Sequence, residues 1–83
     1  MTGDDTLSPE QSRAARRLLN WTAIRLAARS DLGEGTIRNF EEGRRILSAN
    51  NLTAIRAAFE AAGVEFTNGD QPGVRLRKGS GPV

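Results

Sequence analysis

Residues 22–43 read TAIRLAARSDLGEGTIRNFEEG, and the spacing of apolar and polar residues in this stretch decides the fold. The pattern predicts two short helices separated by a turn, one capped by Thr22 and ending near Ser30, the other entered at Leu32 or Gly33 and stopping at Gly43. Apolar residues fall where two crossed helices pack together: Leu26, Ala27, Leu32, Ile37 and Phe40. Polar residues point elsewhere: Arg25, Arg29, Glu34, Arg38 and Asn39. The segment therefore has both a buried side and a polar outward side.

A further helix is predicted before this segment, from about residue 9 to about residue 20. Ser8 supplies an N-cap, Pro9 suits the first helical position, and Gln11 stands at the capping-box position. The inward stripe of this helix is narrow and holds Ser12, Ala15, Arg16 and Leu19, whereas Arg13 and Arg17 lie on another face. An arginine on an inward stripe needs a partner, so the pattern predicts that Arg16 is paired.

A fourth helix is predicted from about residue 49 to residue 62, capped by Ser48 and ended by Gly63. Its inward residues follow helical spacing: Leu52, Ile55, Ala58, Phe59 and Ala62. Trp21 stands at the junction of the first two helices, where we expect core packing rather than stacking on a base. Phe40, Phe59 and Phe66 are likewise core or interface candidates.

The C-terminal part has the alternation of a β-hairpin. Residues 64–67 and 74–77 alternate apolar and polar side chains, and residues 68–73 have the composition of a turn. Val64 and Phe66 should face Val74 and Leu76, and the hairpin should pack on the helices or pair with another chain. The expected organisation is a flexible lead-in over residues 1–7, a helical domain over 8–63, the hairpin over 64–77 and a flexible tail over 78–83.

Composition excludes several classes of function. The 83 residues make one domain and contain neither cysteine nor histidine, which removes disulfides, thiol nucleophiles, zinc sites and histidine catalysis. Glu41 and Glu42 are the nearest approach to a carboxylate pair, but adjacent helical residues point about 100 degrees apart. We therefore expect no enzyme, no catalytic residue, no metal and no cofactor. With no membrane-length apolar stretch and no signal-peptide pattern, we expect a cytoplasmic protein.

The charge distribution is uneven although the net charge is only +2. Eleven of the twelve basic residues are arginine, and Asp4, Asp5 and Glu10 gather at the N-terminus. From residue 13 onward there are twelve basic residues against seven acidic ones. This excess can form a patch that faces phosphates, and the alternative is an ordinary solvated surface.

These residues together resemble the XRE, or lambda-repressor-like, family of helix-turn-helix DNA-binding proteins, which includes phage repressors and many bacterial regulators. The resemblance covers about residues 11–63 and is carried by Arg16, Leu26-Ala27, Ile37, Glu41, Gly43 and the arginines 44 and 45. Residues 61–66 and 72–77 further resemble short members with a C-terminal strand pair. The resemblance implies a mainly α fold, a four-helix DNA-binding domain with a helix-turn-helix and a small C-terminal β-hairpin.

The resemblance also implies roles for particular side chains. Arg16 and Glu41 would form an ion pair between the first and third helices, the alternative being two independent surface charges. The third helix would lie in the major groove, with base contacts from Glu34, Gly35, Thr36, Arg38 and Asn39. Phosphate contacts would come from Thr22, Arg25, Arg29, Arg44 and Arg45.

Within that set, side-chain chemistry suggests which base each residue reads. Arg38 can donate two hydrogen bonds to guanine, Asn39 can pair with adenine or reach a phosphate, and Glu34 can accept from cytosine. The alternative for each is a solvated helix face, and phosphates would repel the Glu34 carboxylate.

The chain departs from the family pattern at three positions. Ala23 replaces a glutamine that contacts a phosphate in many members, and Gly33 replaces the usual Ser or Thr cap of the third helix. Gly35 lies inside that helix and costs about 0.5 to 1 kcal/mol of its stability, which a close backbone approach or ordering on binding would have to offset.

Two functions follow as expectations. The first is a sequence-specific regulator of transcription, a repressor that binds double-stranded DNA as a homodimer on an inverted repeat, with recognition helices about 34 Å apart. The second is an antitoxin-like module with a protein partner, in which the helix-turn-helix serves autoregulation and the hairpin neutralises the partner.

Overall fold

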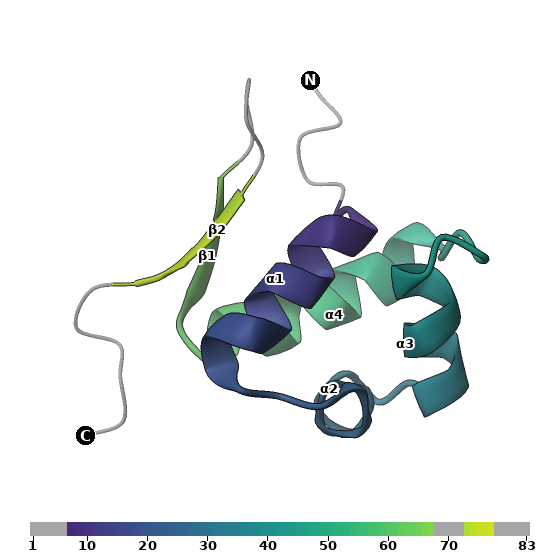
Figure 1. Cartoon of the computed structure of the whole chain (residues 1–83). Helices are drawn as coiled ribbons and strands as arrows, with labels where there is room; N and C mark the ends of the chain where they lie inside the picture. Colours follow the sequence, from purple (N-terminus) through teal and green to yellow (C-terminus); the bar gives the residue numbers. More distant parts are fainter. Residues whose placement is uncertain (1–6, 68–72, 78–83) are drawn as a thin grey trace.

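Four helices precede a two-stranded antiparallel sheet in residues 7–67 and 73–77, the part of the chain that the computed structural model describes (Figure 1). The elements are α1 (Pro9–Leu19), α2 (Ala23–Ser30), α3 (Glu34–Glu41), α4 (Ala49–Ala61), β1 (Val64–Thr67) and β2 (Gly73–Leu76). The predicted fold class, mainly α with a small C-terminal hairpin, is confirmed.

Side-chain caps begin three of the four described helices at the predicted residues. Ser8 Oγ accepts from the amide of Gln11 and Gln11 Oε1 accepts from the amide of Ser8, both at 3.1 Å, which completes a capping box ahead of Pro9. Thr22 and Ser48 accept from the amides three residues onward at 3.1 and 3.2 Å. Each cap satisfies an amide that has no partner within its helix.

Left-handed residues turn the chain after the helices. Asn20 follows α1 with φ 59° and Asp31 follows α2 with φ 60°. Asparagine and aspartate tolerate this conformation because their short polar side chains can hydrogen-bond locally. Gly43 and Gly63 have φ of 80° and 99°, in the turns that follow α3 and α4. The predicted helix ends are therefore confirmed to within one or two residues.

One part of the predicted organisation is wrong. Leu7 was expected in a flexible lead-in, but it is 2% exposed and belongs to the hydrophobic core. Leu7 directly precedes Ser8, the N-cap of α1, and its side chain packs in the core. A single leucine beside polar residues gives no periodic signal, which is why the sequence pattern missed it. The rest of the expected lead-in, residues 1–6, lies outside the described part.

The core is formed where all four helices and β1 meet. Its members are Leu7, Ala15, Ala23, Leu26, Ala27, Ile37, Phe40, Leu47, Ile55, Phe59 and Val64. Phe59 is fully buried, and its ring stacks on Trp21 at 5.7 Å between centroids and meets Phe66 edge-on at 5.9 Å. Trp21 is half-buried against this cluster, as its predicted packing role requires.

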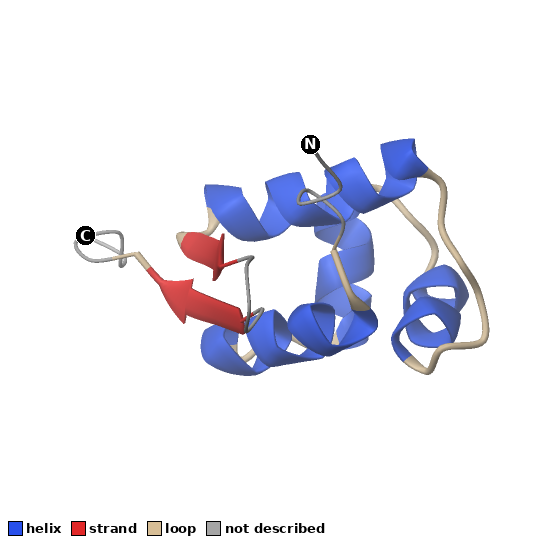
Figure 2. Cartoon of the chain, turned by 90° about the horizontal axis from the view of Figure 1, so that it is seen from above, coloured by secondary structure: helices blue, strands red, loops and turns tan. Residues whose placement is uncertain are grey.

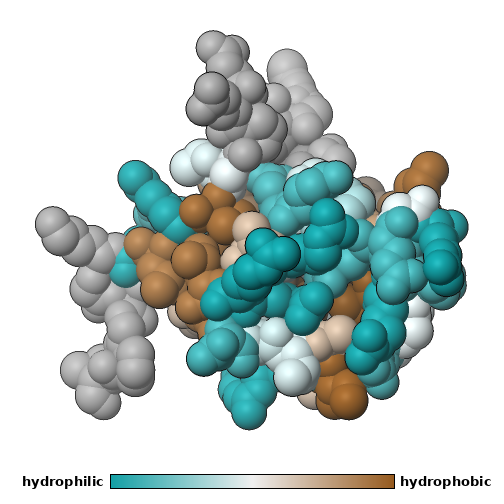
Figure 3. Space-filling view, viewed as in Figure 1, coloured by the Kyte–Doolittle hydropathy of each residue, from teal (hydrophilic) through white to brown (hydrophobic). Residues whose placement is uncertain are grey.

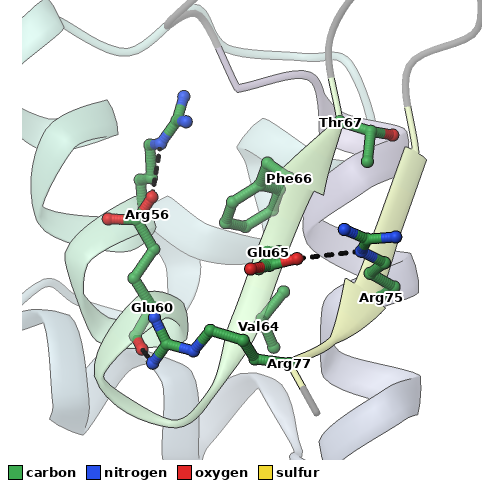
Figure 4. A pocket seen from close by; sticks show the side chains of 8 residues that line it. All are labelled: Arg56, Glu60, Val64, Glu65, Phe66, Thr67, Arg75 and Arg77. Atoms are coloured by element: carbon green, nitrogen blue, oxygen red, sulfur yellow. Dashed lines mark hydrogen bonds and ion pairs between the residues drawn. The ribbon is translucent and has the colours of Figure 1, made fainter.

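The hairpin lies at one end of the molecule, with α1 and α4 on either side (Figure 2). Val64 pairs with Leu76 and Phe66 with Val74, which confirms the predicted register. Glu65 and Arg75 form an ion pair of 2.8 Å on the other face, and Arg56 of α4 lies over the Phe66 ring (Figure 4). The hairpin therefore packs on the helices, one of the two expected arrangements.

Two further predictions fall outside the described residues, namely the turn over residues 68–72 and the tail over 78–83. In the helices that the structure describes, no segment combines the length and apolar character needed to cross a membrane.

Candidate nucleic-acid interface

Helix α3 buries one side and leaves the other in solvent. Ile37, Phe40 and Glu41 are buried against the rest of the domain. None of the five predicted base-contacting residues is buried: Gly35 and Arg38 are exposed, and Glu34, Thr36 and Asn39 are intermediate. Residues three and four apart share a face of a helix, which explains why the buried set at 37, 40 and 41 leaves 35 and 38 outward. The outward side of α3 is thus short, polar and accessible.

Two residues of the predicted base-contacting set contact each other. Arg38 Nε donates to Glu34 Oε2 at 2.6 Å, an (i, i+4) ion pair on the outward side of α3. From the sequence alone, the two residues are predicted to read different bases independently. Their spacing of four residues on one helix was the available signal for a pair.

The beginning of α3 carries no side-chain cap. Gly33 is its N-cap residue, with extended φ and ψ of −77° and 151°, and it offers no side-chain oxygen to the first amides. Gly35 follows two residues later, and a methyl group placed there would meet no atom within 4 Å. Within residues 7–67 and 73–77, therefore, no contact requires a glycine at position 35.

Replacing Gly35 with alanine should raise the free energy of unfolding by about 0.5 to 1 kcal/mol, because alanine loses less backbone entropy in a helix. Thermal and urea unfolding followed by circular dichroism would measure the gain. Gly43→Ala is the matched control: at φ 80° an alanine is strained and should destabilise the protein. A fall in stability with Gly35→Ala would contradict the open position described above.

Glu41, the last residue of α3, joins that helix to α1 through a buried cluster. Arg16 Nη2 lies 2.7 Å and Arg16 Nε 3.2 Å from Glu41 Oε1, and the same Nε lies 3.0 Å from Oε2. Ser12 Oγ donates to Oε2 at 2.6 Å. The Glu41 side chain is 4% exposed and that of Arg16 23%, so this ion pair is largely withdrawn from solvent. The two predicted partners therefore do meet.

Two members of this cluster were missed by sequence reasoning. Ser12 was placed on the inward stripe without a role, yet its hydroxyl satisfies the carboxylate. Arg13 was placed on another face, yet its Nη1 donates to the carbonyl oxygen of Glu41. Arg16 also donates to the carbonyl oxygen of Trp21 at 3.2 Å. Helix α1 thereby holds both the side chain and the backbone at the end of α3.

The predicted phosphate-contacting residues occupy two separate places. Thr22, Arg25 and Arg29 are exposed at the start and along one side of α2. Arg44 and Arg45 are exposed in the loop that directly follows α3. Within the described ranges, Arg25 and Arg45 have no ion-pair partner, so no neighbouring carboxylate offsets the charge of either.

The other residues of this set already have contacts. Arg44 Nη1 lies 3.4 Å from Glu42 Oε1 in an exposed pair. The Arg29 guanidinium lies 5.6 Å from the centroid of the Trp21 ring, a cation–π distance. The Thr22 hydroxyl oxygen accepts from the Arg25 amide as the cap of α2, and its proton is still available to donate.

A family model described as helix-turn-helix, of the Cro/C1 type and XRE-like, matches residues 13–65, well over half of the chain. No curated protein matches the sequence. The match begins within α1, includes α2, α3 and α4, and ends within β1, so it contains the Arg16–Glu41 pair and the exposed side of α3. The chain belongs to this XRE-like helix-turn-helix family and is a DNA-binding regulatory protein.

Proposed function

We propose that the protein is a repressor of transcription that recognises one specific sequence in double-stranded DNA. The observation that carries the proposal is the division of α3, whose inward residues are buried while its polar outward residues are exposed or partly exposed. A helix held in this way can enter the major groove, where base edges present distinct donors and acceptors. Occupying a promoter requires no catalytic group, in keeping with a regulatory family.

Base contacts are assigned to the outward residues of α3: Glu34, Gly35, Thr36, Arg38 and Asn39. Arg38 would donate to guanine O6 and N7, and Asn39 would pair with adenine or reach a phosphate. The open space at Gly35 would allow the DNA to approach the backbone closely. The Gly35→Ala variant also tests this assignment. The added methyl group should weaken DNA binding even though it stabilises the fold.

Phosphate contacts are assigned to Thr22, Arg25, Arg29, Arg44 and Arg45. Arg25 and Arg45 are the strongest members, since neither has to leave an ion pair in the described part of the chain. Arg29 can contact DNA only with the edge of its guanidinium that does not lie over Trp21. Such contacts position the protein on the duplex without reading its sequence.

The proposal extends to assembly and place of action. A homodimer on an inverted repeat would set two α3 helices about 34 Å apart, one turn of DNA. The protein would act in the cytoplasm, at the bacterial nucleoid. Sedimentation of the protein with and without a selected DNA fragment would establish whether two copies bind.

The proposal predicts specific binding with a strong salt dependence. Selection from fragmented host DNA should enrich one inverted repeat, and the affinity for it should fall with a log–log salt slope of about −3 to −4 if the four arginines of this set neutralise phosphates. Replacing Arg44 and Arg45 with alanine should reduce the slope by about two. Arg75→Ala, an exposed arginine on the hairpin, is the control and should leave the slope unchanged. No enrichment and no salt dependence would refute the proposal.

An antitoxin-like role with a protein partner is the second candidate, and the hairpin end of the molecule favours it. Hydrophobic surface gathers over the hairpin (Figure 3), and Leu76 is 49% exposed. The pocket of Figure 4 adjoins this end, but its arginines and glutamates already pair with each other or with backbone. Recovery of one stoichiometric companion from the native host would favour this role over the repressor.

A further inference from the structure

The ion pair on the outward side of α3 uses only part of the Arg38 side chain. Glu34 Oε2 accepts from Nε at 2.6 Å, and neither terminal nitrogen of Arg38 has a partner in the described part of the chain. The side chains are 58% and 39% exposed, so the free end of the guanidinium lies in solvent. A glutamate four residues before a cation is also the favoured order for a helical pair.

We propose that Glu34, one of the five residues assigned to base contact above, acts instead as a positioning residue that holds Arg38 for guanine recognition. This inference rests on the proposed function of α3. A guanidinium has five N–H donors; Glu34 occupies the one on Nε, and the four on Nη1 and Nη2 form the fork that matches guanine O6 and N7. The Glu34 carboxylate occupies the Nε edge of the guanidinium and leaves Nη1 and Nη2 free to donate.

The arrangement has an energetic reason. An arginine loses rotamer freedom when it is immobilised at an interface, and a partner that restrains it beforehand reduces this loss. The same pairing neutralises a carboxylate that DNA phosphates would otherwise repel. The Glu34 carboxylate also lies in the first turn of α3, where the helix dipole favours negative charge.

A double-mutant cycle on a selected DNA site tests the inference. Glu34→Gln should weaken binding about 2- to 10-fold through the lost restraint on Arg38. Arg38→Ala should weaken it about 5- to 150-fold. In the Arg38→Ala background, Glu34→Gln should no longer weaken binding, and it should tighten binding slightly because the unpaired carboxylate is then repelled by DNA phosphates. Replacing the contacted guanine with 7-deazaguanine, which lacks the N7 acceptor, should likewise abolish the effect of Glu34→Gln.

Two variants separate this role from simpler ones. Glu34→Asp keeps the negative charge but shortens the side chain, so it should resemble Glu34→Gln if reach to Arg38 Nε is what matters. Glu60→Gln breaks the comparable (i, i+4) pair with Arg56 on α4, at 2.9 Å, and should leave DNA affinity unchanged. Tighter binding by Glu34→Gln in the presence of Arg38, or an equal loss of affinity in the Arg38→Ala background, would overturn the inference.

A measurement without DNA distinguishes failure of this inference from failure of the proposed function. In the free protein, the hydrogen bond to Glu34 should slow the exchange of the Arg38 Nε proton with solvent, as measured by nuclear magnetic resonance. Glu34→Gln should remove that protection. Absence of protection in the wild-type protein would overturn the pairing itself. Protection without any sequence preference on DNA would overturn the proposed function, and with it the guanine contact, but not the ion pair.

Discussion

Replacing Glu41 with alanine is expected to lower the free energy of unfolding by about 3 kcal/mol. Removing one partner of a buried ion pair costs about 3 to 5 kcal/mol, because the remaining charge stays desolvated. The lower end applies here since the Arg16 side chain is 23% exposed and can recover some hydration. The variant also deprives the buried Ser12 hydroxyl of its acceptor. Urea unfolding followed by the fluorescence of Trp21, the only tryptophan, measures the loss.

The neighbouring glutamate provides the control. Glu42 is 52% exposed and pairs with Arg44 at 3.4 Å, so Glu42→Ala should change stability by no more than about 0.5 kcal/mol. Glu41→Gln should fall between the two, because the amide oxygen can still accept from Ser12 while the charge is lost. Equal stability of the two alanine variants would show that the Arg16–Glu41 pair contributes nothing to the fold.

The cost of Glu41→Ala has a functional counterpart. Arg16 and Arg13 hold the side chain and the carbonyl of the last residue of α3, directly before the loop that carries Arg44 and Arg45. Loosening this junction would alter the position of α3 relative to the loop. Any loss of DNA affinity in the variant should therefore exceed what its unfolded fraction accounts for, when both are measured at a temperature where most molecules are folded.

Local chemistry accounts for what the sequence predicted well. Three of the four helix starts were predictable because Ser8, Thr22 and Ser48 satisfy amides within three residues, and the turns after the helices use asparagine, aspartate or glycine, which tolerate positive φ. The hairpin register followed from alternation alone, since a slip of one residue would turn Val64 and Phe66 to solvent. Each of these features can be predicted from residues that lie close together in the sequence.

Long-range contacts account for what the sequence missed. Arg13 reaches a carbonyl 28 residues away, and a backbone acceptor has no sequence signature. Leu7 is buried by elements that follow it, although its own neighbours are polar. The pair between Glu34 and Arg38 is local, but a patterned helix face does not show whether two charges turn to each other or outward. Resemblance to a family predicted Arg16 and Glu41, not the hydroxyl of Ser12.

Phe59 carries the second large expected effect. Its side chain is fully buried and joins Trp21 to Phe66 through ring contacts of 5.7 and 5.9 Å, so alanine would leave a cavity bordered by two aromatic rings. Phenylalanine-to-alanine changes in cores cost about 3 to 5 kcal/mol. A domain of this size has little stability to spare, so Phe59→Ala should be largely unfolded well below the melting temperature of the wild-type protein. Circular dichroism is the suitable probe, because the fluorescence of Trp21 changes with the contact itself.

The exposed Ile46 provides a control that distinguishes the loss of a buried side chain from the loss of a hydrophobic side chain. Ile46 lies in the loop after α3 and is 95% exposed, so Ile46→Ala removes apolar atoms without opening a cavity and should change stability by no more than about 0.5 kcal/mol. Phe59→Leu keeps most of the volume and should retain a cooperative transition at an intermediate temperature. Helix α4 contributes none of the proposed DNA contacts, so the folded fraction of Phe59→Leu should bind DNA as the wild-type protein does. A wild-type melting temperature for Phe59→Ala would mean that the α4–hairpin contact does not hold the helices together.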